Sequence, residues 1–147
     1  MSDSWLDRIP SQERQRIRER LRSPAEYERL REKVKGPEDL EREMERNELL
    51  AELKFAMESE PKLAEALRAQ VQEDIRLNGL PSVLHSLHLS SALTLALTKG
   101  DFAISVEPDA ETHVDQLVLV PEGKVREAVP VSQKFSEQYL GQFKKAA

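Results

Sequence analysis

The sequence predicts an α+β protein with four to five N-terminal helices, including a long helical hairpin, then a small antiparallel β-meander and a C-terminal helix. Apolar residues recur at helical spacing up to residue 78 and alternate after residue 79. Charge falls at the same point: residues 1–78 hold 16 Lys or Arg and 19 Asp or Glu, against 6 and 8 in residues 79–147. We therefore predict a charged helical region over residues 1–78 and a compact α+β region over residues 79–147, packed as one unit.

Capping residues place the first helices. Ser4 can open a short helical turn, and Ser11 can cap a helix over about residues 12–22, because a hydroxyl accepts from the first free amides. Ser23-Pro24-Ala25-Glu26 combines an N-cap serine, a proline at the first helical position and a glutamate at the third, which is a full capping box. Gly36-Pro37 ends that helix and starts the next.

Two long helices follow. The first runs to about Glu58, and Pro61 suits the first position of a second helix that ends near Asn78-Gly79. Apolar residues recur every four positions in the second helix, at Leu63, Leu67, Val71 and Ile75. So short a break predicts either an antiparallel helical hairpin or one bent rod. An inter-chain coiled coil is a further alternative, but the heptads are not sustained.

The next segment has two interpretations. Residues 80–89 suit one short helix. Residues 93–98 and 101–106 both alternate, and folding the chain at Lys99-Gly100 sets three large apolar pairs on one face of a β-hairpin. The rival is a helix from about residue 82 to 99 that Gly100 would cap, because Leu and Ala favour helices. We favour the hairpin; residues 82–98 remain open between helix and strand.

The C-terminal segment is predicted to form a strand, a turn, a second strand and a helix. Leu117–Val120 forms a strand, residues 121–124 form a turn, and Val125–Val131 forms a further strand that Pro130 places at a sheet edge. Ser132 caps a terminal helix with an aromatic face of Phe135, Tyr139 and Phe143.

Composition limits the function classes. The sequence has no cysteine, which excludes disulfides, thiolate catalysis and Cys-ligated metal sites. A formal net charge of −5 argues against general attraction to nucleic acid or anionic membrane. The polar N-terminus lacks the pattern of a secretory signal, and half of the uncharged run Leu77–Thr98 is not apolar. We expect a cytoplasmic protein with no membrane segment.

No catalytic motif stands out. The sequence lacks Gly-x-Ser-x-Gly, a Gly-rich phosphate loop and a His-Glu-x-x-His helix, so no catalytic residue, metal ligand or cofactor is assigned. His85 and His88, at i and i+3 of a helix, together with His113, support an alternative hypothesis of a small enzyme or metal-binding protein. Scattered histidines are more often surface residues, and we expect a protein that is not an enzyme.

A basic segment carries the strongest functional signal. Residues 11–35 hold nine cations against five glutamates, and Arg14, Arg18 and Arg22 share one helical stripe. Such a stripe could follow phosphates, and this supports a nucleic-acid-associated regulator as the alternative function. Residues 36–78 hold six cations against twelve anions, so the basic helices can instead pack beside acidic ones.

The favoured function is protein–protein interaction. The apolar stripes of the N-terminal helices are narrow; Ile17 and Leu21 together stabilise by about 4 kcal/mol at most, less than ordering a dozen residues costs. These helices therefore need a partner surface, in this chain, in a second copy or in another protein. We expect an adaptor or small regulatory subunit that docks through its helical arm.

Overall fold

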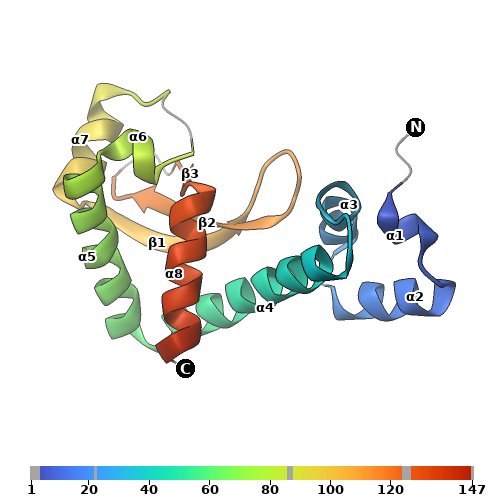
Figure 1. Ribbon diagram of the computed structural model, residues 1–147. Coiled ribbons are helices and arrows are strands. Elements are labelled where there is room, and N and C mark those ends of the chain that lie inside the picture. Colours follow the sequence, from blue (N-terminus) through green and yellow to red (C-terminus); the bar gives the residue numbers. More distant parts are fainter. Residues whose placement is uncertain (1–3, 22, 86–87, 124–126, 147) are drawn as a thin grey trace. The chain divides into compact units, whose positions relative to one another are not determined.

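The structure, a computed structural model, describes residues 4–21, 23–85, 88–123 and 127–146. Figure 1 labels its elements in chain order. Their bounds are α1 (Trp5–Arg8), α2 (Ser11–Arg20), α3 (Pro24–Lys33), α4 (Pro37–Ser59), α5 (Pro61–Asn78), α6 (Leu80–Val83), α7 (Ser91–Lys99), β1 (Phe102–Pro108), β2 (Asp115–Pro121), β3 (Val129–Pro130) and α8 (Gln133–Ala146). The predicted α+β class is confirmed, with five helices in the described part of residues 1–78, a three-stranded antiparallel sheet and a C-terminal helix.

Packing divides the chain into two compact units. The first comprises Met1–Leu49 and Pro108–Asp115, and the second comprises Leu50–Glu107 and Gln116–Ala147. Helix α4 contributes its N-terminal half to the first unit and its C-terminal half to the second. The boundary near residue 79 rests on composition and stays a prediction.

Of the three serine caps predicted for the N-terminal helices, two are present. The hydroxyl of Ser4 accepts from the amide of Leu6 at 3.3 Å, and that of Ser23 accepts from the amide of Glu26 at 3.4 Å. The cap at Ser11 was predicted wrongly, because Pro10 is the N-cap and Ser11 is already helical. The Pro10 carbonyl takes the first helical hydrogen bonds, so the serine hydroxyl is not needed there.

The first unit has its own apolar core. Its buried members come from four helices and the α3–α4 connection: Leu6, Ile17, Tyr27, Leu30, Val34 and Met44. Trp5, Ile9, Leu21 and Leu40 pack around them, half-buried. The narrow stripe on α2 is therefore covered inside the unit, and the partner surface that its burial requires comes from the same chain.

The favoured β-hairpin at Lys99-Gly100 was wrong, because its first half is helix α7. The hydroxyl of Ser90 accepts from the amide of Leu93 at 3.2 Å and caps the helix. Gly100 ends it in the left-handed region, with φ of 84° and ψ of 17°. The Asp101 amide then reaches the Ala96 carbonyl at 2.9 Å, which completes a glycine-terminated helix end.

The alternating leucines of α7 fit both structures, which explains the error. On the helix, Leu93 and Leu97 share the buried face at i and i+4, while Leu95 is 55% exposed. The short helix expected over residues 80–89 is present only as α6.

The sheet is a meander in the order β1-β2-β3. β2 contains the predicted strand Leu117–Val120. β3 pairs antiparallel with β2, with Val118 opposite Pro130 and Leu119 opposite Val129. Only this short piece of the predicted strand over residues 125–131 is observed as a named strand, and residues 124–126 lie outside the described residues.

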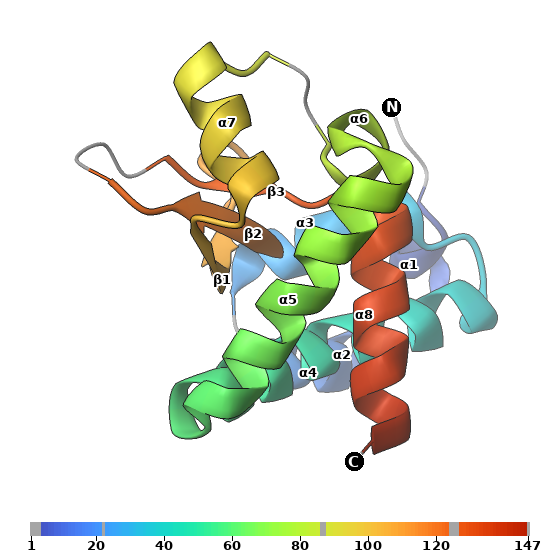
Figure 2. The ribbon, with the colours of Figure 1, turned by 90° about the vertical axis from the view of Figure 1, so that its left-hand side faces the viewer.

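Helix α8 packs beside α5, as both ribbon views show (Figures 1 and 2). The hydroxyl of Ser132 accepts from the Phe135 amide at 3.4 Å, which confirms the predicted cap. The Tyr139 hydroxyl donates to Asp74 of α5 at 2.7 Å, and burial raises the pKa of this tyrosine well above its usual range. The predicted aromatic face is buried at Phe135 and Tyr139 and half-buried at Phe143.

Candidate interaction site on the helical arm

The helical arm, defined here as α1 to α3, contains the predicted arginine stripe. Arg14 and Arg18 lie on α2, and Arg22 lies outside the described residues. Arg14 is half-buried, and its Nε atom is buried without a hydrogen bond. Arg18 is exposed, and its guanidinium carbon lies 4.5 Å from the centre of the Tyr27 ring. Arg14 is thus partly buried in the unit, whereas Arg18 is exposed and lies over an aromatic ring.

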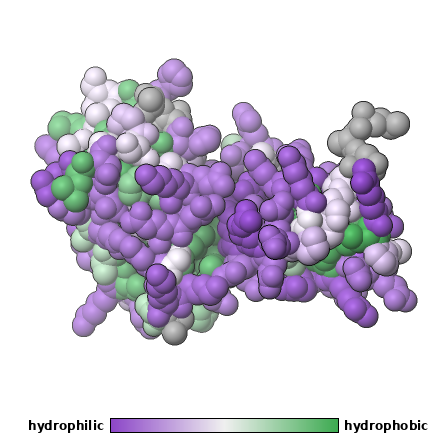
Figure 3. Space-filling view, in the orientation of Figure 1, coloured by the Kyte–Doolittle hydropathy of each residue, from purple (hydrophilic) through white to green (hydrophobic). Residues whose placement is uncertain are grey.

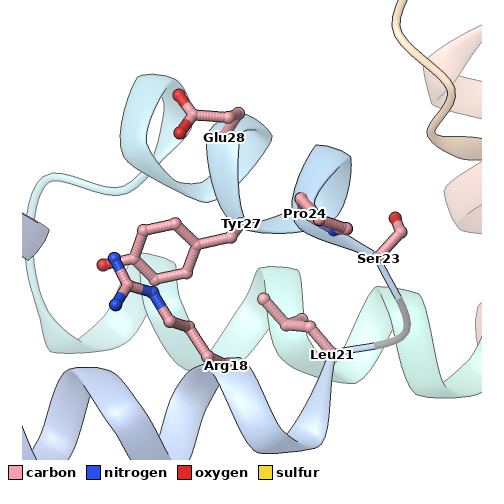
Figure 4. Close-up of a pocket in the computed structure, with 6 residues that line it drawn as sticks. All are labelled: Arg18, Leu21, Ser23, Pro24, Tyr27 and Glu28. Atoms are coloured by element: carbon pink, nitrogen blue, oxygen red, sulfur yellow. The ribbon is translucent and has the colours of Figure 1, made fainter.

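Arg18 and Tyr27 form one side of a pocket of about 380 Å³. Its other lining residues are Leu21, Ser23, Pro24 and Glu28 (Figure 4). Figure 4 shows the Arg18 guanidinium against the Tyr27 ring, with Leu21 and Pro24 to the other side of that ring in this view. The pocket therefore combines the apolar surface of Leu21 and Pro24 with the Arg18 cation and the Glu28 carboxylate.

Local sequence explains this geometry. The Ser23 capping box starts α3 immediately after α2, and Tyr27 follows in its first turn. The ring is only 6% exposed because it belongs to the core of the unit. A cation over a tyrosine ring is stabilised by about 0.5–1 kcal/mol at an exposed site, and the contact fixes the plane of the guanidinium.

Other arginines of the arm pair with carboxylates of the same unit. Arg20 of α2 meets Glu48 of α4 at 2.5 Å, and Arg29 of α3 meets Glu43 of α4 at 3.3 Å. At these two positions the basic helices pack beside the acidic helix, as the charge pattern suggested. Each pair reduces the positive field that the arm presents to a polyanion.

Arg31 links α3 to α1. Its guanidinium donates to Asp7 at 3.0 Å and to Glu28 at 3.1 Å. The hydrogen bond from Arg31 holds the pKa of Asp7 below its usual value, and the same bond raises the pKa of Arg31. Glu28 also lines the pocket, so the pocket holds one carboxylate, which pairs with Arg31, beside the Arg18 cation.

A second groove of about 640 Å³ lies between α1 and α3. Trp5 and Val34 are its apolar members, and the polar ones are Ser4, Arg8, Glu28, Arg31, Glu32 and Lys35. Its charged lining residues are of both signs. Figure 3 likewise shows hydrophilic residues over most of the face in view. This groove carries no dominant charge that would select a ligand.

The histidines do not share a helix. α6 ends at Val83, so His85 follows the helix and His88 lies in a further segment without helical structure. His113 is exposed in the β1–β2 loop, with a φ of 62°. Within the described residues, no group of three or more His, Cys, Asp or Glu side chains is placed to hold a metal ion.

Sequence reasoning missed the role of Tyr27. No aromatic residue interleaves with the arginines along α2, and the sequence therefore showed no stacking contact. The capping box is the sequence signal that could have indicated this contact. It fixes the residue at which α3 starts, and therefore which side chain of α3 faces α2.

Comparisons of the chain with protein-family models, with curated proteins and with solved structures find no match. Among the helices of the described residues, none is both long and apolar enough to cross a bilayer.

Proposed function

We propose that this protein is an interaction protein without catalytic activity, an adaptor or small regulatory subunit, which docks a partner protein on its helical arm. The observation that carries this proposal is the Arg18–Tyr27 contact in the wall of a pocket that Leu21 and Pro24 also line. Arginine is enriched among the residues that dominate protein interfaces, and an arginine that is already held in place by Tyr27 loses little entropy on binding.

The chemistry of the pocket indicates what the partner presents. Arg18 offers a planar fork of N–H groups, and a carboxylate matches that fork in a bidentate pair. Leu21 and Pro24 offer apolar surface in the same pocket. The occupant is therefore an acidic side chain with an apolar neighbour, as found on one face of an amphipathic segment.

Charge pairing within the unit favours a protein over a nucleic acid. Arg20 and Arg29 already pair with Glu48 and Glu43, so phosphates would have to displace these contacts. Tyr27 is buried beneath Arg18, so its ring does not offer a free face on which a base could stack.

The experiment is affinity capture from native extract with the full chain and three variants, with and without nuclease. Arg18→Glu should weaken capture of one stoichiometric protein roughly tenfold or more, the loss typical of a central interface residue. Arg16→Glu is the matched control, since Arg16 is exposed on the same helix and does not line the pocket.

Arg18→Lys separates charge from geometry. It keeps the cation and loses the planar fork, so a carboxylate partner should be lost with it, whereas phosphate contacts depend mainly on charge. Equal capture by the wild type and Arg18→Glu would refute the docking site. Capture that disappears with nuclease and survives Arg18→Lys would establish the nucleic-acid alternative instead.

A further inference from the structure

Helix α5 ends on an asparagine that a glycine follows. Asn78 is the last residue of the helix, and Gly79 is its C-cap, with φ of 84° and ψ of 153°. Asn78 is exposed, and Gly79 is half-buried. Asparagine is a chemically labile residue, and glycine has no Cβ to hinder attack by its main-chain nitrogen. The pair is therefore a candidate site of covalent change by deamidation.

Deamidation of this pair needs no reagent other than water. Water takes the proton from the Gly79 main-chain nitrogen, which attacks Cγ of Asn78. The N–Cγ bond forms, the Cγ–Nδ2 bond breaks, and Nδ2 leaves as ammonia with a proton that water returns. Water then adds to either carbonyl of the cyclic imide, which opens to aspartate or to isoaspartate. Nothing is oxidised or reduced, since the net change consumes water and releases ammonia.

The folded end of α5 keeps the reacting atoms apart. The Gly79 amide donates to the Ile75 carbonyl at 2.8 Å, and Nδ2 of Asn78 donates to the Asp74 carbonyl at 3.1 Å. In an α-helix the Cα–Cβ bond leans toward the N-terminus, so the Asn78 side chain is directed away from the amide that follows it. The last turn of α5 must therefore open before the nitrogen can reach Cγ.

Opening of this turn exposes little apolar surface. Arg76, Leu77 and Asn78 are already exposed, whereas Ile75, in the preceding turn, is buried. Helix ends open at far lower free energy than core segments do. Arg76 opposes the opening, because it donates to Glu73 at 3.0 Å and its cation is favourable at the C-terminal end of the helix.

Asn47, the other asparagine of the sequence, is placed differently. It lies within α4, is 7% exposed, and is followed by Glu48 in the same helix. The attacking nitrogen there belongs to a residue with a side chain, and it is released only when the middle of a long helix opens. Conversion should therefore occur at Asn78 well before Asn47.

We propose that Asn78 is the site of spontaneous deamidation in this protein, and that opening of the last turn of α5 limits its rate. The amount of aspartate and isoaspartate at residue 78 then measures how long this turn has been open. The inference is independent of docking by the arm, because Asn78 and Gly79 belong to the second unit.

The products fit the helix end less well than asparagine does. Aspartate loses the Nδ2 donor to the Asp74 carbonyl and places a negative charge at the C-terminus of α5, where the helix dipole disfavours it. Isoaspartate lengthens the main chain directly before Gly79, which is also the N-cap of α6. The Asn78→Asp variant should therefore unfold at a lower urea concentration than the wild type, and an equal midpoint would contradict this consequence.

The first test follows conversion at both asparagines of the full chain by peptide mass spectrometry, at physiological pH and temperature, in buffer and in urea. In buffer, Asn78 should convert at least about tenfold faster than Asn47, and urea should raise the rate at Asn78 at least about tenfold. Conversion at Asn78 no faster than at Asn47 would overturn the site. A rate at Asn78 that urea leaves unchanged would overturn its limitation by opening.

The second test changes the stability of the last turn alone. Arg76→Glu replaces its cation by an anion and should raise the rate at Asn78 in buffer at least about twofold. Lys62→Glu is the matched control, since it makes the same charge change in the first turn of α5, where an anion is favourable. In urea both variants should convert at the wild-type rate. Equal rates of the two variants in buffer would contradict limitation by the last turn.

Discussion

Replacing Gly100 by alanine tests whether helix α7 needs a left-handed glycine at its C-terminal end. Gly100 has a φ of 84°, and a Cβ built there would lie 2.5 Å from both the Cδ and Oε1 atoms of Gln72. The Gln72 amide also donates to the Lys99 carbonyl at 2.9 Å and accepts from Arg68 at 3.2 Å. The added methyl group must therefore displace a side chain that satisfies the end of the helix.

The expected cost follows from these contacts. A left-handed alanine costs about 1–2 kcal/mol, and loss of the Gln72 hydrogen bond costs about 1 kcal/mol. Reduced entropy of the unfolded chain returns about 0.5 kcal/mol. The net loss of unfolding free energy is about 2 kcal/mol, which lowers the melting temperature by about 4–8 °C for a chain of this size.

The assay is urea and thermal unfolding followed by circular dichroism, with Gly141→Ala as the matched control. Gly141 lies within α8, and its added methyl group meets nothing within 4 Å. That variant should be more stable than the wild type by up to about 1 kcal/mol. The double variant Gly100→Ala/Gln72→Ala should show less than additive loss. Equal stability of Gly100→Ala and Gly141→Ala would refute the account of the helix end.

Two further predictions concern buried and surface hydrogen bonds. Tyr139→Phe should lower the unfolding free energy by about 1–2 kcal/mol in urea, because it removes the bond to Asp74. The pKa of Tyr139 is raised in the folded state, so the contribution of this tyrosine to the unfolding free energy is complete below the unfolded pKa of about 10 and is lost as the pH rises above it. The unfolding free energy of the wild type should therefore begin to fall at a lower pH than that of Tyr139→Phe, and the reverse order would contradict this prediction. Asp7 should titrate below its usual pKa in carbon-detected NMR, since Arg31 stabilises the carboxylate, and its contribution to stability should fade as pH falls through that lowered value. Arg31→Ala should return the titration midpoint of Asp7 to the ordinary range for a carboxyl group. An unchanged midpoint would show that the Arg31–Asp7 pair does not form in solution.

The sequence correctly predicted the helices whose first residues are marked by a capping serine or a proline. Ser4, Ser23 and Ser132 each cap the helix expected of them, because hydroxyl capping depends on neighbours in the chain. Pro37 and Pro61 likewise start α4 and α5 where expected. Such signals need no knowledge of tertiary contacts.

The prediction from the sequence was wrong where tertiary contacts determine the secondary structure. The alternation of Leu93, Leu95 and Leu97 fits a strand as well as a helix, and the helix prevails with one leucine left exposed. Helix α5 supports that outcome, because Gln72 donates to the carbonyl of Lys99, the last residue of α7, and Arg68 donates to the carbonyl of Gly100, its C-cap.

The candidate site was predictable only in part. The arginine stripe was evident from its spacing, but its partner Tyr27 lies on the next helix and meets Arg18 only when the two helices pack.

The most direct test of docking by the arm is site-specific photo-crosslinking in native cells. Benzoylphenylalanine placed at Pro24, which is exposed and lines the Arg18–Tyr27 pocket, should crosslink one partner protein. The same residue placed at Lys62, exposed on α5, should not capture that protein. A crosslink at Pro24 that disappears in Arg18→Glu is the predicted result. No protein crosslink at Pro24, or the same product from both positions, would contradict the proposal that the arm is the docking element.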